Sequence, residues 1–281
     1  MTLREGPALL AAGTTLHVEP DVTNETWLRR NHARITGFIS VASFLAIWEV
    51  VARMRVVPAL FLPGPTDVVR AGIEASQHPQ LWTDLSTSGM ELAIGYTLAA
   101  VTAIPLGLLT GWYPLWRHAT DPFINFLYAT PRVVLVPLFI IWFGIGPESK
   151  VALVYLGAFF SIVINTNAGV RSLDPNLLKV ARSFGASDLR IFRTIALPGS
   201  VPFILTGLRL GIGHALIAVV VGELIGARAG IGLRIAIAGA TFQTAKVFAL
   251  VTVVATTGLV MTAVLARLEA HFDRWRIRDR E

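Results

Sequence analysis

The chain has 281 residues and a formal net charge of +6; 54% of its residues are hydrophobic and only 15% are charged. About a quarter of a soluble domain's residues are charged, so this composition excludes an ordinary soluble fold. The chain contains no cysteine, which also excludes a disulfide framework, a thiol nucleophile and a cysteine-ligated metal. The basic residues are scattered among hydrophobic runs with no aromatic platform between them, which argues against nucleic-acid binding.

Several apolar runs are long enough to cross a lipid bilayer, which takes about 20 residues in a helix. Residues 1–31 lack the order of a signal peptide and predict a tail. We therefore expect an all-α membrane protein embedded in the lipid bilayer. Its six predicted transmembrane helices are Ile35 to Val51, Met90 to Trp112, Phe123 to Phe143, Val151 to Gly169, Val201 to Ile225 and Val247 to Leu265.

The segments between these spans contain helix breakers and charged residues. Residues 61–66 include two prolines and a glycine, and the polar segment that follows, up to Ser88, is expected to lie outside the hydrocarbon. Residues 144–150 are short enough to predict a turn between two antiparallel spans. After Ile225 we expect a glycine-rich loop that continues to Lys246.

The distribution of Lys and Arg predicts the orientation, because short basic loops stay on the cytoplasmic side. If both termini are cytoplasmic, most of the Lys and Arg beside the spans lie inside. The expected organisation is a cytoplasmic tail at 1–31, a transmembrane domain at 32–270 with a cytoplasmic insert at 171–198, and a cytoplasmic tail at 271–281.

The insert at 171–198 predicts two short amphipathic helices. Asp174 and Pro175 form an N-cap and first-turn pair, and Gly185 is typical of a left-handed helix end. Ser187 can cap the second helix, which Pro198 is expected to end. Helices this short are marginal alone, so their apolar faces need a surface, either the chain's own membrane helices or a second protein.

The insert also resembles the EAA loop of permease subunits in ATP-binding-cassette importers. The resemblance covers about residues 35–270 and is strongest to the branch that serves nitrate, taurine, alkanesulfonates and bicarbonate. The matching residues of the insert are Ala181, Gly185, Ile195, Leu197 and Pro198. Further matching segments are Leu62-Pro63 with Pro65, Pro131 through Pro137-Leu138, Trp142 to Gly146, Ser149-Lys150, Gly207-Leu208-Arg209, Glu223-Leu224 and Gly230-Ile231-Gly232. Where the family usually has Glu-Ala-Ala, this chain has Lys179-Val180-Ala181.

The resemblance implies a type I importer permease fold in the cell inner membrane. It implies two permease copies, separate ATPase subunits that bind ATP and Mg, and an extracytoplasmic solute-binding protein. The chain itself would then hold no cofactor or metal and would not be an enzyme. The residues implied to couple to the ATPase are Lys179, Val180, Ala181, Gly185, Ile195, Leu197 and Pro198.

Two polar side chains inside the spans are candidates for the substrate passage. Arg132 lies near the middle of the third span, where a charge is costly and usually marks function. Its guanidinium could bind an oxyanion in a bidentate way, or it could form an internal ion pair or hydrogen bonds to helix carbonyls near Pro131. His214 lies at a similar depth in the fifth span, where it either lines the same passage or is a packing residue.

These observations predict a transporter subunit that moves a small, anionic solute and couples to an ATPase through residues 174–198. The alternative is a secondary transporter without an ATPase, which would need coupling-ion carboxylates in mid-membrane and internal symmetry. The chain contains no phosphate-binding G-x-x-x-x-G-K-[ST] loop, no H-E-x-x-H and no G-x-S-x-G motif, so we expect energy and chemistry to come from a partner.

Overall fold

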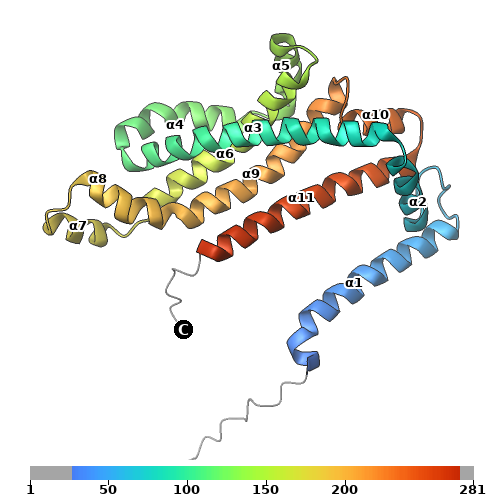
Figure 1. Cartoon of the computed structure of the whole chain (residues 1–281), viewed down its shortest axis with the longest axis horizontal. Helices are drawn as coiled ribbons and strands as arrows, with labels where there is room; N and C mark the ends of the chain where they lie inside the picture. Colours follow the sequence, from blue (N-terminus) through green and yellow to red (C-terminus); the bar gives the residue numbers. More distant parts are fainter. Residues whose placement is uncertain (1–26, 273–281) are drawn as a thin grey trace, which may run out of the picture. The chain divides into compact units, whose positions relative to one another are not determined.

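The fold was analysed in a computed structural model that describes residues 27–272, with side chains for 35–267 (Figure 1). Most of the two predicted tails, 1–31 and 271–281, falls outside the described residues. The chain divides into two compact units, Met1–Trp48 and Glu49–Glu281. Within the described part every regular element is a helix, which confirms the predicted all-α class.

The helices follow one another along the chain with short connections. They are α1 (Trp27–Arg53), α2 (Pro65–Ser76), α3 (Pro79–Trp112), α4 (Pro114–Ala129), η2 (Arg132–Leu135), α5 (Val136–Phe143), α6 (Pro147–Arg171), α7 (Pro175–Ser183), α8 (Asp188–Ile191), η3 (Phe192–Ala196), α9 (Leu197–Ile225), α10 (Ile231–Ala240) and α11 (Thr244–Phe272).

Five of the described helical segments are long and apolar enough to cross a membrane, and a sixth crossing results if one bent pair counts as a span. The five segments are Ile35–Arg53, Pro79–Trp112, Pro147–Arg171, Asp188–Ile225 and Thr244–Arg267. All five overlap predicted spans, and counting the bent pair as one span gives the six crossings expected from the sequence.

The third predicted span is wrong as a straight helix. Instead of one helix, α4 and the η2–α5 segment meet at an angle of 91°. Proline disfavours helical backbone in the residue before it, and Thr130 accordingly has an extended conformation (φ −73°, ψ 126°) just before Pro131. Arg132 therefore begins a short 3₁₀ helix at a break instead of lying inside a straight helix.

The connecting segments also contain helices. The polar segment up to Ser88, which is expected to lie outside the hydrocarbon, is formed by α2 and the first turns of α3, which begins at Pro79. The expected loop between Ile225 and Lys246 contains α10, which has 10 residues. At 1.5 Å per residue α10 is about 15 Å long, half the thickness of the hydrocarbon, so it cannot span the bilayer alone.

Helix α6 packs against both α3 and α9, and together they form the core of the second unit (Figure 1). Glycines make the close approach possible: an added Cβ at Gly107 of α3 would lie 2.6 Å from Thr166 Cβ and 2.8 Å from the Val163 carbonyl oxygen. On the other side of α6, Gly207 and Gly211 of α9 face Ile162. Small residues at such contacts are typical of packed membrane helices.

This packing predicts that Gly107→Ala destabilises the permease by about 1–3 kcal/mol, because the new methyl group overpacks a contact with backbone. Gly89→Ala in the same helix is the matched control, since nothing lies within 4 Å of its added Cβ. Thermal unfolding in detergent micelles measures both variants. Equal stability of the two would contradict the assigned packing of α3 on α6.

Candidate functional site

The insert at 171–198, here called the coupling loop, has the predicted helix ends. The Asp174 side chain accepts a hydrogen bond from the Asn176 N–H at 2.8 Å, which caps α7. The Ser187 hydroxyl oxygen accepts from the Arg190 N–H at 3.4 Å and caps α8. Gly185 has φ +74°, a left-handed conformation that favours glycine. All three local predictions are confirmed.

The end of α7 is a Schellman motif, which fixes the turn between the two short helices. The Ala186 N–H donates to the Ala181 carbonyl oxygen at 3.2 Å, and the Gly185 N–H donates to the Arg182 carbonyl oxygen at 2.9 Å. A surface ion pair between Arg182 and Asp188, 3.5 Å apart, also crosses the turn. The turn therefore holds α7 and α8 in a defined arrangement.

The apolar side of the coupling loop is divided between the protein interior and the surface. Leu178 and Ala181 are half-buried, whereas the side chains of other apolar residues remain exposed. The exposed fractions are 49% for Leu177, 52% for Val180, 88% for Phe184 and 58% for Leu189. The membrane helices of the chain thus cover only part of the predicted apolar faces.

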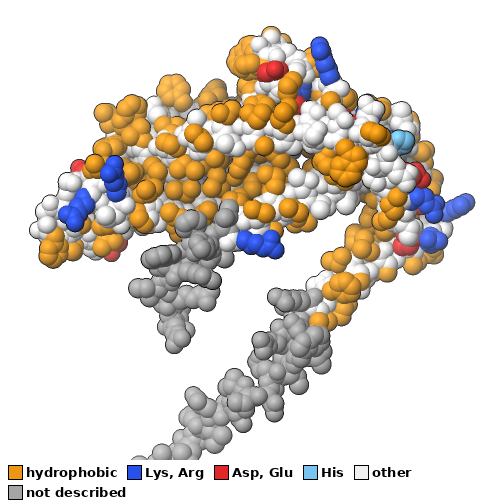
Figure 2. Space-filling model, in the orientation of Figure 1, with side chains coloured by type: hydrophobic (Ala, Val, Ile, Leu, Met, Phe, Trp, Pro, Cys, Tyr) orange, Lys and Arg blue, Asp and Glu red, His pale blue; other side chains and the backbone are white. Residues whose placement is uncertain are grey.

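Basic residues surround this exposed apolar surface. Lys179, Arg182, Arg190 and Arg193 are all exposed. Figure 2 shows basic side chains beside hydrophobic ones at the end of the molecule that carries α7 and α8. A surface of this kind can dock in an apolar groove with acidic side chains at its edge. We call Leu177, Val180, Phe184, Leu189 and these four basic residues the docking surface.

The prediction that Pro198 ends the second helix is wrong. Helix α8 continues through the π-helical turn η3 into α9, and Pro198 lies in the first turn of α9. In this wider turn the Leu197 N–H donates to the Phe192 carbonyl oxygen, five residues earlier. The π turn changes the hydrogen-bond register just where proline has no N–H to contribute, so the helix continues.

The other residues of the motif lie along this continuous helix. Ile195 is half-buried in the π turn, and Leu197 is 37% exposed at the start of α9. The ring of Phe192 packs edge-on against Trp112 at the end of α3, with centroids 5.6 Å apart. The coupling loop is therefore anchored to α3 and is continuous with α9.

Arg132 and His214 line the same cavity, which has a volume of about 270 Å³. The break before Arg132 places it beside α9, although the third span in which it was expected is not a single helix. The guanidinium carbon lies 5.7 Å from the centre of the Tyr128 ring, a cation–π distance. The cavity lining includes Arg132 as its cation and contains no carboxylate. Its chemistry suits a small anion.

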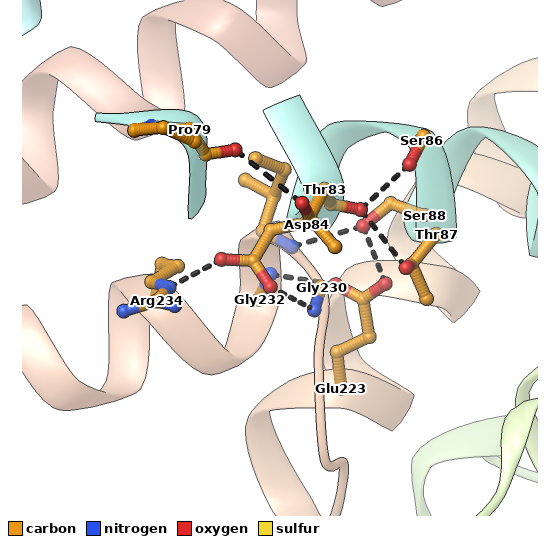
Figure 3. Close-up of polar contacts among 11 residues, drawn as sticks. Pro79, Thr83, Asp84, Ser86, Thr87, Ser88, Glu223, Gly230, Gly232 and Arg234 are labelled. Carbon is orange, nitrogen blue, oxygen red and sulfur yellow. Dashed lines mark hydrogen bonds and ion pairs between the residues drawn. The ribbon is translucent and has the colours of Figure 1, made fainter. Parts of the chain in front are cut away.

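A polar cluster that the sequence analysis did not predict joins α3, α9 and α10 (Figure 3). Ser88 donates to Glu223 at 2.5 Å and accepts from the Ile231 N–H at 2.9 Å. Glu223 also accepts from the Gly232 N–H at 2.6 Å. Asp84 accepts from the Gly230 N–H at 2.9 Å and pairs with Arg234. Three side chains thus satisfy the first N–H groups of α10.

The sequence contains a signal that could have revealed this cluster. Asp84, Ser88 and Glu91 are spaced i, i+4, i+7, so they share one face once α3 is known to start at Pro79. Asp84 and Glu91 are each 2% exposed, and Glu223 is fully buried. Among the described residues, no group of three or more His, Asp or Glu side chains could hold a metal ion.

Comparison with known proteins agrees with this architecture. Residues 103–278 match the family described as binding-protein-dependent transport system inner membrane component. A probable ABC transporter permease of Brucella abortus (strain 2308) is 34% identical over 88% of this chain and 99% of its own. The taurine transport system permease of Escherichia coli (strain K12) is 33% identical over 84% and 88%. A Bacillus subtilis (strain 168) permease, provisionally named for aliphatic sulfonates transport, is 33% identical over 95% and 96%.

Solved structures share the fold at low sequence identity. A chain of the inward-facing MetNI methionine ABC transporter superposes with a TM-score of 0.59 and 16% identity, covering 69% of this chain and 98% of that one. A chain of a bacterial alginate ABC transporter, crystallised with an alginate-bound periplasmic protein, gives a TM-score of 0.53 at 16% identity over 88% and 96%. The chain belongs to the family of inner membrane components of binding-protein-dependent transport systems, the permeases of ABC transporters.

Proposed function

We propose that this chain is the membrane-crossing subunit of an ATP-driven importer for a small anionic solute, coupled to a separate ATPase through residues 174–198. The exposed docking surface carries this proposal, because a capped and rigid apolar surface with a basic edge needs a partner. The ATPase subunits bind ATP and Mg, and their groove presents acidic side chains toward Lys179 and its basic neighbours. The permease itself is not an enzyme.

The remaining partners in this proposal come from the family. An extracytoplasmic solute-binding protein delivers the solute, and a second copy of the chain completes the membrane passage. Both termini lie in the cytoplasm of an inner-membrane protein, as the distribution of Lys and Arg predicts. Relatives named for taurine and aliphatic sulfonates support a sulfonate-like anion as the solute.

The cavity beside α9 is the proposed passage site. Its volume of about 270 Å³ lies just below the range of about 300–1,000 Å³ that is typical of ligand sites, which suits a small solute. Arg132 provides a forked donor for an oxyanion, and His214 lies on the same cavity from α9. The Tyr128 ring next to the guanidinium holds the cation without neutralising it, so its charge remains available to an anion.

Truncation of the most exposed apolar side chain tests the docking surface. We expect Phe184→Ser to leave permease stability unchanged and to weaken binding of the ATPase about tenfold or more, because a buried aromatic anchor contributes much of an interface's energy. Phe61→Ser is the matched control, since Phe61 is also exposed but lies between α1 and α2. Titration of the ATPase onto reconstituted permease gives both affinities. Equal affinities would refute the docking surface.

The left-handed residue at the α7–α8 turn tests coupling. Gly185→Val should leave the permease in the membrane and reduce solute-dependent ATP hydrolysis by about tenfold or more, because a β-branched residue at φ +74° costs about 1–3 kcal/mol and the turn would shift to relieve it. Gly185→Asn is the matched control, because asparagine tolerates this conformation. Hydrolysis is measured in proteoliposomes that contain the complex. Normal hydrolysis by the valine variant would exclude a coupling role for the turn geometry.

The role of Arg132 is tested by uptake of taurine into proteoliposomes. We expect Arg132→Gln to lower the apparent affinity about 10- to 100-fold, which corresponds to the loss of a charged hydrogen bond of about 1.5–3 kcal/mol. Arg132→Lys keeps the charge but loses the fork, so it should have an intermediate effect. If the glutamine variant transports with wild-type affinity and rate, only a structural role remains for Arg132. The same variants are also tested for nitrate uptake. If Arg132→Gln weakens nitrate uptake but not taurine uptake, taurine is the wrong probe. If it weakens neither, Arg132 does not bind the anion.

A further inference from the structure

Trp112 is the last residue of α3, and its neighbours in the sequence fix its position. Proline disfavours helical backbone in the residue before it, and Tyr113, which precedes Pro114, accordingly has an extended conformation (φ −106°, ψ 111°). On the other side of Trp112, an added Cβ at Gly111 would lie 2.6 Å from Val170 Cβ of α6. Helix α3 therefore ends directly after Trp112, and its last turn is packed against α6.

Phe192 of the coupling loop contacts this tryptophan. The two half-buried rings meet edge-on, with their centroids 5.6 Å apart and their planes at an angle of 67°. This geometry is favourable for a pair of aromatic side chains. The preceding residue, Ile191, is fully buried, whereas Phe184 on the docking surface is 88% exposed. This part of the coupling loop is thus held by the chain itself, while the docking surface is left for a partner.

Phe192 also begins the π turn that joins the coupling loop to α9. Its carbonyl oxygen accepts the hydrogen bond from the Leu197 N–H, while its ring contacts Trp112. The backbones of α7, α8 and η3 pack mainly on one another and on α9, which leaves the link to α3 to side chains. One residue of the coupling loop therefore contacts both long helices, α9 through its backbone and α3 through its side chain.

Farther from the coupling loop, α3 and α9 are linked to each other again. The Tyr96 hydroxyl of α3 donates to the Leu208 carbonyl oxygen of α9 at 2.9 Å. At the start of α10, Ser88 of α3 donates to Glu223 of α9 at 2.5 Å (Figure 3). The two helices are thus joined at the coupling loop, in the middle and at the far end, and α6 packs against both.

We propose that Trp112 is a positioning residue for energy coupling: through Phe192 it makes α3 follow the coupling loop together with α9. The inference rests on the proposed function, because it takes the coupling loop as the contact with the ATPase. A displacement of α9 alone would break the hydrogen bonds of Tyr96 and Ser88, which join it to α3. The aromatic contact avoids this loss, because the same displacement then acts on both helices.

The variant Trp112→Ala tests this role in proteoliposomes that contain the permease with its ATPase and solute-binding protein. We expect the affinity of the permease for the ATPase to stay at the wild-type value, because Trp112 lies outside the docking surface. The amount of taurine taken up per ATP hydrolysed should fall about 2- to 10-fold, which corresponds to the loss of one aromatic contact. Trp112→Phe keeps an aromatic ring and should retain most of the coupling. Trp116→Ala is the matched control, since this tryptophan of α4 is 52% exposed.

A double-mutant comparison separates transmission from a general loss of stability. If Trp112 acts through Phe192, the variant with both Trp112→Ala and Phe192→Ala should be no less coupled than Trp112→Ala alone. The chain contains no cysteine, so Trp112→Cys and Phe192→Cys can be joined specifically with a short bifunctional thiol reagent. This cross-link should restore the uptake per ATP that the two substitutions remove. A merely structural role would lower thermal stability in micelles and leave the uptake per ATP unchanged.

The outcomes distinguish this inference from the proposed function. If the ATPase binds neither the wild-type permease nor Trp112→Ala, the proposed function fails. If it binds both equally and the uptake per ATP is also equal, only the role of Trp112 is refuted. Additive losses in the double variant, or a cross-link that does not restore coupling, would likewise overturn the inference. Should Trp112→Ala not fold, Trp112→Leu keeps an apolar side chain at the position without the ring, and the same reduced uptake per ATP is expected.

Discussion

The close packing of α9 on α6 is the constraint on which the rest of the structure depends. In lipid every backbone group must find its partner within the protein, so the membrane part is built from helices whose mutual approach is set by side-chain size. Gly207 and Gly211 allow α9 to lie directly against Ile162 of α6, and Gly107 does the same for α3. Because these contacts involve backbone, the three helices behave as one packed body.

Three functional features are placed along α9. The coupling loop enters it through the π turn before Leu197, His214 lies 17 residues farther on, and Glu223 follows 9 residues after that. At 1.5 Å per residue these steps are about 26 Å and about 14 Å. In the proposed coupling, a continuous helix thus connects the docking surface with the cavity and with the buried cluster. Hydrogen bonding along this path is altered at the π turn and at Pro202, which has no N–H to donate.

The sequence predicts local features well and tertiary features poorly. Asp174, Gly185 and Ser187 were assigned correctly because caps and left-handed stops depend on a few neighbouring residues. The two prolines show the limit of such rules: Pro131 breaks a span predicted as one helix, whereas Pro198 does not end the helix that it was expected to end. The difference depends on whether an adjacent π turn compensates for the hydrogen bond that proline cannot donate. The sequence does not reveal whether such a turn forms.

The candidate site was predictable in part for the same reason. Arg132 and His214 could be selected as costly polar residues in apolar runs, and they do line one cavity. The buried cluster was missed because Asp84 and Ser88 are common exterior residues, and their burial depends on α10, whose ten residues were read as a loop. Asp84 and Ser88 cap a helix only because α10 packs against them.

Buried carboxyl groups in a transporter raise the question of whether proton movement drives transport. A secondary transporter would bring its coupling-ion group to the solute site in mid-membrane. Here Glu223 is tied to the backbone of α10 and is about 14 Å along α9 from His214, and neither Glu91 nor Glu223 lines the cavity. Such buried carboxyl groups are compatible with the proposed importer, whose energy would enter at the opposite end of α9, through the coupling loop.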